Sequence, residues 1–352
     1  MIKMTKFLRF SIIGTGTGSN LVAKAFKPIR EKKIADIVSV TSKREERAKN
    51  FAEKYSIKSW YTDYNKMFRE EELDAIIICT PHYLHLPMTI DALEHGINVL
   101  VDKPMAITLK QCDEMIRRAQ KAGVKLGVLF QYRFDDKIRR IKDIIDNGKL
   151  GKIILSEATV KWYRTQEYYD NSPWRGRFAT EGGGVLINQA IHYIDLILWL
   201  LGEPSRLYAK VATFTHNIEV EDNALIMITF KNGSLGIVQA STSTYPGLPT
   251  RLEIHGENGT ILMEGDSIKM IAIKGEEIIR EEKKEGLESW ARPEAVPAVN
   301  HTKLIIDFIH SILDDREPLV NGYEGRKSIE FIRAAYFSAK HNCEVSFPFE
   351  EV

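Results

Sequence analysis

From Phe7 to Phe130 the chain alternates short apolar stretches with amphipathic ones, and this alternation constrains the fold more than any other feature of the sequence. The apolar stretches have the length of strands, and the stretches between them have the period of helices. Such an alternation predicts a parallel sheet covered by helices on both faces. The expected strands are Phe7–Ile13, Ile34–Thr41, Ala75–Cys79, Asn98–Val101 and Lys125–Phe130, and the expected helices are Ser19–Lys27, Glu45–Tyr55, Met67–Glu71, Pro87–His95 and Leu109–Ala122.

The pattern changes after Tyr132. From Ser205 to Ile273 the chain alternates in the manner of strands, with turn signals at residues 231–233 and 257–259, which predicts an antiparallel sheet. We therefore expect an α/β domain over residues 1–131 and an α+β domain with a large, mostly antiparallel open sheet over residues 132–352. The other expected elements there are helices Asp136–Asn147, Val185–Leu201, Thr302–Asp314 and Gly322–His341, strands around Ile153–Arg164 and Glu344–Phe347, and a long loop over Lys274–Asn300.

Length and composition exclude several classes of protein. A chain of 352 residues suits two domains, and its 49 basic and 48 acidic residues provide no excess charge for binding nucleic acid. Cys79, Cys112 and Cys343 lie too far apart for a disulfide framework or a CxxC metal knuckle. We find no signal peptide, and no window approaches the roughly 18 apolar residues of a membrane span. We therefore expect a cytoplasmic protein without a nucleic-acid or membrane partner.

A glycine-rich turn stands between the first expected strand and the first expected helix. It consists of Gly14, Thr15, Gly16, Thr17, Gly18 and Ser19. The first glycine permits a tight turn, the second lets the backbone approach a pyrophosphate, and the helix start offers N–H groups. Serine at the third glycine position makes the fingerprint imperfect, and an ordinary strand-to-helix turn is the alternative. The strand before it and the strand–helix units after it favour a Rossmann fold that binds a nicotinamide dinucleotide.

The end of the second strand bears on the choice of cofactor. A carboxylate there would accept hydrogen bonds from the adenosine ribose of NAD. This chain has Ser42, Lys43 and Arg44 instead, a hydroxyl and two cations that suit a 2′-phosphate. The pattern favours NADP(H), with NAD(H) as the second candidate. Alternatively, Lys43 and Arg44 only open a solvated helix.

Two turns and one helix resemble motifs of the Gfo/Idh/MocA oxidoreductases. Thr80–His85 is similar to the TPN-x-x-H turn of that family, and Asp102–Pro104 is similar to its EKP turn. Gly182–Asp195 is similar to its GGG-x-L-x-D-x-x-x-H-x-x-D helix, and the likeness extends to Gly322–Val345. The resemblance implies an oxidoreductase of sugars, cyclitols or sugar derivatives. It also implies a homodimer or homotetramer formed through the open sheet of the second domain.

Lys103 and His192 are the expected catalytic pair. Lys103 follows a parallel strand, at the sheet edge where ligands of α/β folds collect, although a surface lysine on a turn is the alternative. His192 follows Asn188 by four residues, so both side chains share one face if the helix is regular. An imidazole titrates near neutrality and suits proton transfer to or from a hydroxyl. The resemblance makes His192 the general acid/base and Lys103 its catalytic or substrate-positioning partner.

Asn188 departs from the pattern of the family, in which many members carry aspartate at this position. A neutral amide cannot share protons with Lys103 or His192, so the pair must act without that carboxylate. The version with Asn188 and Gln189 is similar to a subset that includes UDP-sugar dehydrogenases. This weakens the analogy with polyol dehydrogenases.

The remaining candidates surround these motifs. Tyr168 and Tyr169 lie with Arg164, Trp174 and Arg175 in an aromatic-rich stretch before the glycine triplet. Aromatic rings that stack on a sugar, with arginines on its hydroxyls or phosphates, would make a sugar site. An ordinary packing role is the alternative for the two tyrosines. His82 and His85 lack partners at metal-ligand spacing, so no metal is expected. The expected substrate contacts are Asn188, Gln189, Arg164, Trp174, Arg175 and Arg133, and the further expected cofactor contacts are Thr80, Pro81, His82, His85, Asp102, Lys103, Gln131, Trp174 and Arg175.

Three functions fit these features. The favoured one is a dehydrogenase or reductase that transfers a hydride between the nicotinamide and a sugar-type hydroxyl or carbonyl. The second is an enzyme that oxidises its substrate transiently and returns the hydride from a tightly held cofactor. The third is a non-catalytic protein that senses a nucleotide or sugar, which would have no need for Lys103 and His192.

Overall fold

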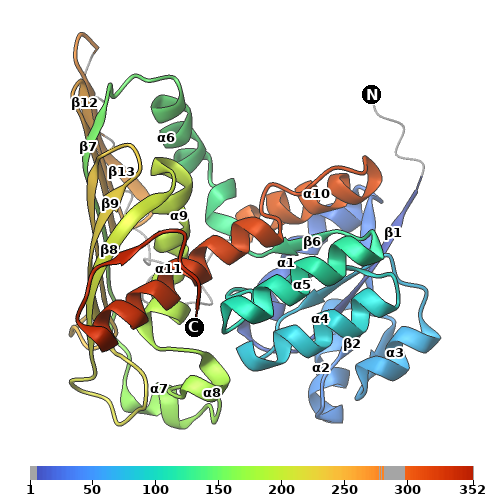
Figure 1. The fold of residues 1–352 in the computed structure, drawn as a ribbon. Helices are drawn as coiled ribbons and strands as arrows, with labels where there is room; N and C mark the ends of the chain where they lie inside the picture. The colour runs from blue at the N-terminus through green and yellow to red at the C-terminus, as the bar shows by residue number, and fades with distance from the viewer. Residues whose placement is uncertain (1–5, 277, 279, 281–297, 352) are drawn as a thin grey trace. The chain divides into compact units, whose positions relative to one another are not determined.

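The computed structural model describes residues 6–276, 278, 280 and 298–351. The chain forms two compact units, Met1–Phe134 with Val296–Arg326, and Asp135–Ala295 with Lys327–Val352. Each unit contains one sheet (Figure 1). Each unit is therefore built from two segments of the chain, because Val296–Arg326 packs with the first unit. The expected division, residues 1–131 and 132–352, has a single boundary.

The sheet of the first unit has six strands in the order β3-β2-β1-β4-β5-β6, and every described pair in it is parallel. This confirms the Rossmann-type α/β fold. The short strand β3 was not expected. The strands are β1 Leu8–Ile13, β2 Ala35–Thr41, β3 Ser59–Tyr61, β4 Ala75–Ile78, β5 Asn98–Val101 and β6 Leu126–Val128; the helices are α1 Thr17–Glu31, α2 Glu45–Tyr55, α3 Tyr64–Glu70, α4 His85–Glu94, α5 Leu109–Ala122 and α10 Val299–Leu313, with the short 3-10 turns η1 His82–Leu84 and η2 Gln131–Phe134.

Local sequence explains why α5 has the expected bounds. Thr108 caps the helix start, where its hydroxyl accepts a hydrogen bond from the Gln111 N–H. Gly123, in the left-handed region at φ +66°, ends it. The buried residues between these two ends recur every three or four positions and face the sheet: Leu109, Cys112, Met115, Ile116 and Ala119.

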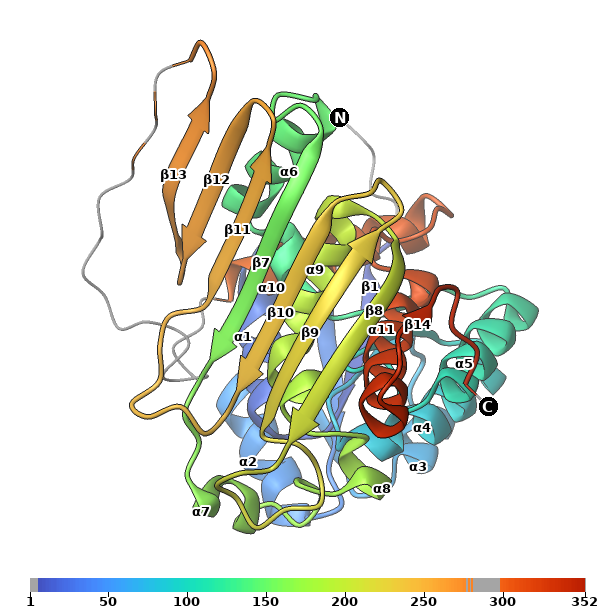
Figure 2. The same cartoon turned by 60° about the vertical axis from the view of Figure 1, so that its left-hand side comes forward.

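The sheet of the second unit has eight strands in the order β13-β12-β11-β7-β10-β9-β8-β14 (Figure 2). Only the pair β7–β10 is parallel among the described strands, which confirms a mostly antiparallel sheet. The two predicted turns join β9 to β10 and β11 to β12. The strands are β7 Ile153–Lys161, β8 Pro204–Ala212, β9 Asn223–Phe230, β10 Leu235–Ser241, β11 Arg251–Gly256, β12 Gly259–Glu264, β13 Ser267–Ile273 and β14 Val345–Ser346; the helices are α6 Asp136–Asp146, α7 Gln166–Asp170, α8 Phe178–Glu181, the π-helix η3 Leu186–Ala190, α9 Ile191–Leu201 and α11 Gly322–His341. The residues of α11 up to Arg326 are assigned to the first unit and those from Lys327 to the second.

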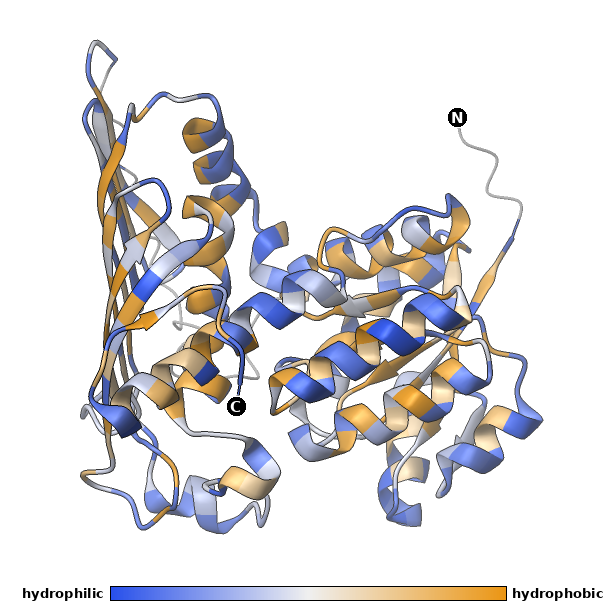
Figure 3. Cartoon of the chain, viewed as in Figure 1, coloured by the Kyte–Doolittle hydropathy of each residue, from blue (hydrophilic) through white to orange (hydrophobic). Residues whose placement is uncertain are grey.

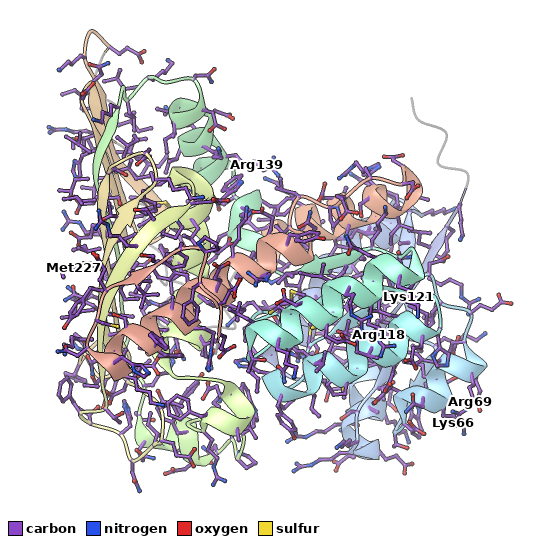
Figure 4. All side chains as sticks on the ribbon, viewed as in Figure 1. Lys66, Arg69, Arg118, Lys121, Arg139 and Met227 are labelled. Atoms are coloured by element: carbon purple, nitrogen blue, oxygen red, sulfur yellow. The ribbon has the colours of Figure 1, made fainter. Side chains whose placement is uncertain are left out.

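Helices cover only one face of this sheet in the part of the chain that the structure describes (Figures 1 and 2). The strands alternate accordingly: Ile226 and Ile228 of β9 are buried, whereas Leu225 and Met227 are 56% and 59% exposed. Met227 points away from the helices in Figure 4. Its register partner Ile237 on β10 is also exposed. We call the exposed residues Leu155, Leu225, Met227, Leu235 and Ile237 the open apolar face.

The segment Phe178–Leu201 corrects one expectation, because it is long and apolar enough to cross a membrane by length and composition alone. Its most apolar stretch is 83% buried inside the fold. The helix α9 within it is apolar nearly all round (Figure 3), since it packs between the sheet and other helices of its unit. A central core helix therefore explains the composition of this segment. Most of the expected loop Lys274–Asn300 lies outside the described residues.

Candidate functional site

The turn after β1 has the properties of a phosphate cradle. A Cβ on Gly14 would lie 2.2 Å from the Cys79 carbonyl oxygen, so the end of β1 closely approaches the end of β4. A Cβ on Gly16 would meet no atom within 4 Å. Gly16 begins α1, which has no side-chain cap and no acidic residue in its first turn. The helix start therefore offers backbone N–H groups to an anion, as a dinucleotide pyrophosphate requires.

The Asp102–Pro104 turn lies beside this cradle. A Cβ on Gly18 would lie 2.7 Å from Asp102 Oδ2, while Asp102 Oδ1 accepts a hydrogen bond from the Lys103 N–H at 2.8 Å. Desolvation raises the pKa of the Asp102 carboxyl. Lys103 therefore follows directly after a residue that contacts the first turn of α1.

His85 connects the two turns that follow β4 and β5. Its Nδ1 lies 2.8 Å from the Pro104 carbonyl oxygen, and its Nε2 lies 2.9 Å from the Thr80 carbonyl oxygen. The ring is fully buried, and His82 is also buried. Within the described ranges, no group of three or more His, Cys, Asp or Glu side chains is arranged to hold a metal ion. His85 thus binds backbone on both sides and shapes the turn that presents Lys103.

The end of β2 brings Ser42 to the phosphate cradle. Thr15 Oγ1 lies 3.3 Å from Ser42 Oγ, and the Ser42 N–H donates to the Tyr61 carbonyl. Lys43 and Arg44 are exposed at the start of α2. These three positions hold no carboxylate, so the hydroxyl and the cations are the groups available there.

Two further candidates of the first unit, Gln131 and Arg133, are buried. Gln131 and Arg133 lie in η2, and Arg133 is only 2% exposed. Its guanidinium forms an ion pair of 2.7 Å with Glu324. This contact is structural, and a role for Arg133 at the substrate remains a prediction.

In the second unit, the glycine triplet contacts other parts of the protein itself. A Cβ on Gly183 would lie 2.0 Å from Tyr336 Oη, and a Cβ on Gly184 would lie 1.8 Å from the Glu221 carbonyl oxygen. The Glu221 carboxylate accepts hydrogen bonds from the N–H groups of Gly184 and Leu186, both at 2.9 Å. Burial raises the pKa of Glu221 to about 7. These glycines permit a close approach of the protein to their backbone.

The helix after the triplet is not regular, unlike the expected helix Val185–Leu201. Leu186–Ala190 is a π-helix, and α9 begins only at Ile191. The side chain and backbone of Glu221 accept hydrogen bonds from the N–H groups of Gly184, Val185 and Leu186, which caps the start of this segment. Short π segments occur frequently at functional sites. Asn188 lies in the π segment and His192 in α9, so their sharing of one face stays a prediction.

Tyr168 is the centre of a polar cluster in this unit. The Arg175 guanidinium lies 4.1 Å from the Tyr168 ring centre, and that of Arg164 lies 5.4 Å from it. The Tyr168 hydroxyl accepts hydrogen bonds from the Gln189 side chain at 3.3 Å and the Asn188 side chain at 3.5 Å. Burial raises the pKa of Tyr168. The structure thus groups four predicted substrate residues around a tyrosine for which packing was the alternative role.

Trp174, a fifth predicted substrate residue, joins this cluster through Arg175. The Arg175 guanidinium lies 5.2 Å from the Trp174 ring centre. One arginine therefore contacts two aromatic rings, an arrangement that holds a planar cation in place.

Glu181 is a member of this cluster that sequence reasoning missed. It ends the short helix α8, is 1% exposed, and accepts a hydrogen bond from the Asn188 side-chain nitrogen at 2.5 Å. Its position directly before the glycine triplet could have indicated this role, because an ionisable residue next to an apolar segment needs a hydrogen-bonding partner when it is buried.

His192 lies on α9 and is 9% exposed; Asp195, three residues later, is 1% exposed. Lys103 and His192 belong to different units, so their action as a pair stays a prediction.

Comparison with known proteins agrees with this architecture. Residues 8–130 match the model of an oxidoreductase family with an NAD-binding Rossmann fold, and residues 138–262 match the GFO/IDH/MocA C-terminal domain. The D-glucoside 3-dehydrogenase of Escherichia coli is 30% identical over 67% of this chain and 70% of its own. The scyllo-inositol 2-dehydrogenase (NADP(+)) IolW of Bacillus subtilis is 26% identical over 95% of this chain and 94% of its own.

A solved structure gives the same result. The WlbA dehydrogenase of Bordetella pertussis, in complex with NADH and UDP-GlcNAcA, superposes with a TM-score of 0.87. It is 27% identical, and the match covers 98% of this chain and 100% of the other. The fold, the cofactor cradle and both matched domains lead to one conclusion: the chain belongs to the Gfo/Idh/MocA family of oxidoreductases.

Proposed function

We propose that this protein is an NAD(P)-dependent dehydrogenase or reductase that acts on a hydroxyl or carbonyl of a sugar, cyclitol or sugar derivative. The observation that carries the proposal is the contact between the Asp102–Pro104 turn and the first turn of α1. Ligands of open α/β sheets bind at the carboxyl ends of the strands, and Lys103 follows β5 at that edge, which supports a role for Lys103 next to the nicotinamide. The relatives whose names state sugar or cyclitol substrates support the same class of reaction.

In this proposal, Lys103 and His192 act on one oxygen of the substrate. The bound nicotinamide supplies or accepts the hydride at carbon. In the oxidative direction, His192 takes the proton of the substrate hydroxyl while the Lys103 ammonium donates a hydrogen bond to the same oxygen. In the reductive direction, His192 returns a proton to the developing alkoxide. The cluster around Tyr168 positions the sugar, through residues that include Arg164, Arg175 and Asn188.

We further propose NADP(H) as the preferred cofactor, with NAD(H) as the second candidate. Ser42 and the two cations after it suit a 2′-phosphate, and a carboxylate is absent from these positions. Among the relatives, one carries NADP(+) in its name and another was solved with NADH, so both cofactors occur in proteins similar to this one.

The proposal includes a homodimer or homotetramer formed through the open apolar face. Its side chains are exposed by 40% to 59%, an arrangement typical of surfaces that another chain covers. Size-exclusion chromatography with light scattering tests the assembly. Met227→Lys with Ile237→Lys should yield monomers, and an unchanged mass would contradict this interface.

We also propose a cytoplasmic location. The thiols of Cys79, Cys112 and Cys343 form no disulfide with one another, which is compatible with a reducing compartment. Cell fractionation followed by immunoblotting tests this location, and recovery of the protein outside the cytoplasmic fraction would contradict it.

A substrate panel tests the reaction. Sugars, inositols and UDP-sugars are incubated with NADP⁺ or NAD⁺ while the absorbance of reduced nicotinamide is followed. Lys103→Ala and His192→Ala should each lower turnover by about 10²–10⁴ and leave the cofactor dissociation constant nearly unchanged. Wild-type turnover in either variant would remove that residue from the mechanism.

The same panel separates the two other functions. A transient-oxidation enzyme would convert substrate without added cofactor and would release nicotinamide dinucleotide only on denaturation. A sensing protein would bind dinucleotide or sugar, as measured by calorimetry, and would convert no member of the panel.

A further inference from the structure

The carboxylate of Glu181 joins two parts of the cluster around Tyr168. Its Oε2 accepts a hydrogen bond from the Gly176 N–H at 2.5 Å, directly after Trp174 and Arg175. Its Oε1 accepts one from the Asn188 side-chain nitrogen, also at 2.5 Å. Both oxygens thus face a donor, and the side chain is 1% exposed. A carboxylate is the group that satisfies two N–H donors at once.

This contact fixes the orientation of the Asn188 amide. The nitrogen faces Glu181 and the Tyr168 hydroxyl, so the carbonyl oxygen lies on the opposite side of the planar group. The reverse orientation would place the amide oxygen against the carboxylate, which is repulsive. We propose that Glu181 is a positioning residue: it holds Asn188 so that its carbonyl oxygen accepts a hydrogen bond from a substrate hydroxyl.

This inference rests on the proposed function, and it explains the unusual residue at position 188. An aspartate there would place two carboxylates within hydrogen-bonding distance, and such a pair retains one proton because both cannot readily ionise. The chain instead has a single carboxyl group here, that of Glu181, and an amide at Asn188. The amide nitrogen bonds that carboxyl group, while the amide oxygen remains an acceptor for the substrate.

Two single variants break the arrangement in different ways. In Glu181→Gln, the oxygen of the new amide accepts from the Gly176 N–H, so its nitrogen points toward Asn188. The Asn188 amide then turns its oxygen toward this nitrogen. Its own nitrogen, a donor, faces the substrate in place of the acceptor oxygen. Loss of such a contact corresponds to about a tenfold to hundredfold lower kcat/KM. In Asn188→Asp, the protonated carboxyl still donates to Glu181, so activity persists at acidic pH. The activity of this variant falls as the pH rises through the pKa of the carboxyl pair. The wild type has no such loss of activity at alkaline pH.

The double variant E181Q/N188D is the decisive test because it restores both contacts with the roles exchanged. The introduced glutamine accepts from the Gly176 N–H and donates to the introduced aspartate, whose second oxygen faces the substrate as an acceptor. We expect kcat/KM to recover to within about threefold of wild type, and the alkaline loss of activity of N188D to disappear. If the losses of the single variants simply multiply in the double variant, Glu181 does not position Asn188.

A matched control uses another buried glutamate of the second unit. Glu221 also accepts two backbone N–H bonds, but its partners are Gly184, Leu186 and Tyr336 rather than Asn188. N188D/E221Q should therefore retain the alkaline loss of activity that N188D shows. Rescue by E221Q as well as by E181Q would show a general effect of buried charge and would overturn the inference.

Thermal unfolding makes the test independent of catalysis. The Tm of N188D should fall with rising pH more steeply than that of wild type, and E181Q/N188D should lose this extra slope. If wild-type protein converts no substrate of the panel, the proposed function fails. The comparison of Tm against pH for N188D and E181Q/N188D still decides whether Glu181 holds the side chain at position 188. If turnover is present and neither pH profile nor Tm shows coupling, the inference alone fails.

Discussion

The two glycine-rich turns of this molecule look alike in sequence and differ in what surrounds them. At Gly16 in the first unit, an added Cβ would meet no protein atom within 4 Å. At Gly184 in the second unit, an added Cβ would lie 1.8 Å from the Glu221 carbonyl oxygen. The first turn leaves space for a ligand, whereas the second is filled by Glu221 and Tyr336. A run of glycines thus indicates a close approach, but not whether a ligand or the protein makes it.

The largest expected effect is on the filled turn. Gly184→Ala would force the backbone around Glu221 to move, because its new methyl group overlaps the carbonyl oxygen. We expect the free energy of unfolding to fall by more than about 4 kcal/mol, beyond the roughly 1–3 kcal/mol of ordinary overpacking, because backbone atoms have to move. Chemical denaturation followed by circular dichroism measures it. A loss no larger than that of an ordinary surface substitution would mean that the triplet is not packed as described.

The second prediction concerns the pH dependence of the same turn. Burial raises the pKa of Glu221 from 4.5 to about 7, so the folded state binds more protons than the unfolded state between these values. This contribution to stability is complete below pH 4.5 and is lost as the pH rises toward 7, by roughly 3 kcal/mol in total. Glu221→Gln should remove that slope while lowering Tm at acidic pH. Parallel curves of Tm against pH for the two proteins would refute the assignment.

The open turn should respond in the opposite way. Gly16→Ala adds a methyl group that clashes with no described protein atom, at the helix start where we expect the pyrophosphate. We expect Tm to change by less than about 2 °C, and dinucleotide affinity to fall by about thirtyfold, or about 2 kcal/mol. Nucleotide fluorescence gives the dissociation constant. Unchanged affinity would show that the pyrophosphate does not lie on this turn.

The smallest effect sharpens what the open turn binds. Ser42→Asp places a carboxylate next to Thr15, where it would repel a 2′-phosphate and accept from ribose hydroxyls. The ratio of kcat/KM for NADP⁺ to that for NAD⁺ should fall by at least about tenfold, which corresponds to about 1.4 kcal/mol. The conservative Ser42→Thr serves as the control. If the ratio stays constant, the phosphate is held elsewhere or not at all.

The fold was largely predictable because its signals are local. The apolar strands and the caps of α5 depend on neighbouring residues, and α2, α5, β5 and α11 have the expected bounds. β3 was missed because it is very short and none of its residues is fully buried. The parallel pairing of β7 with β10 also has no local signal, since β8 and β9 separate the two strands along the chain.

The candidate site was harder to predict because its contacts are long-range. Residues such as Arg164 and Asn188 could be chosen from motif and residue type. The start of the π-helix Leu186–Ala190 is capped by Glu221, which follows only after α9 and β8. The role of Glu181 could be inferred only from the structure, in which its carboxyl group bonds both the Gly176 N–H and the Asn188 side chain. Sequence patterns thus indicated which residues matter, and the structure showed how they are held.

Isotope transfer tests the central claim most directly. A substrate from the panel that carries deuterium at the reacting carbon is turned over with NADP⁺ or NAD⁺, and the reduced nucleotide is analysed by NMR. We predict deuterium on the nicotinamide ring, a primary isotope effect on kcat, and a transfer slowed by about 10²–10⁴ in Lys103→Ala and His192→Ala. Deuterium that appears in the solvent, or a nucleotide that remains oxidised while product accumulates, would contradict hydride transfer as the reaction of this protein.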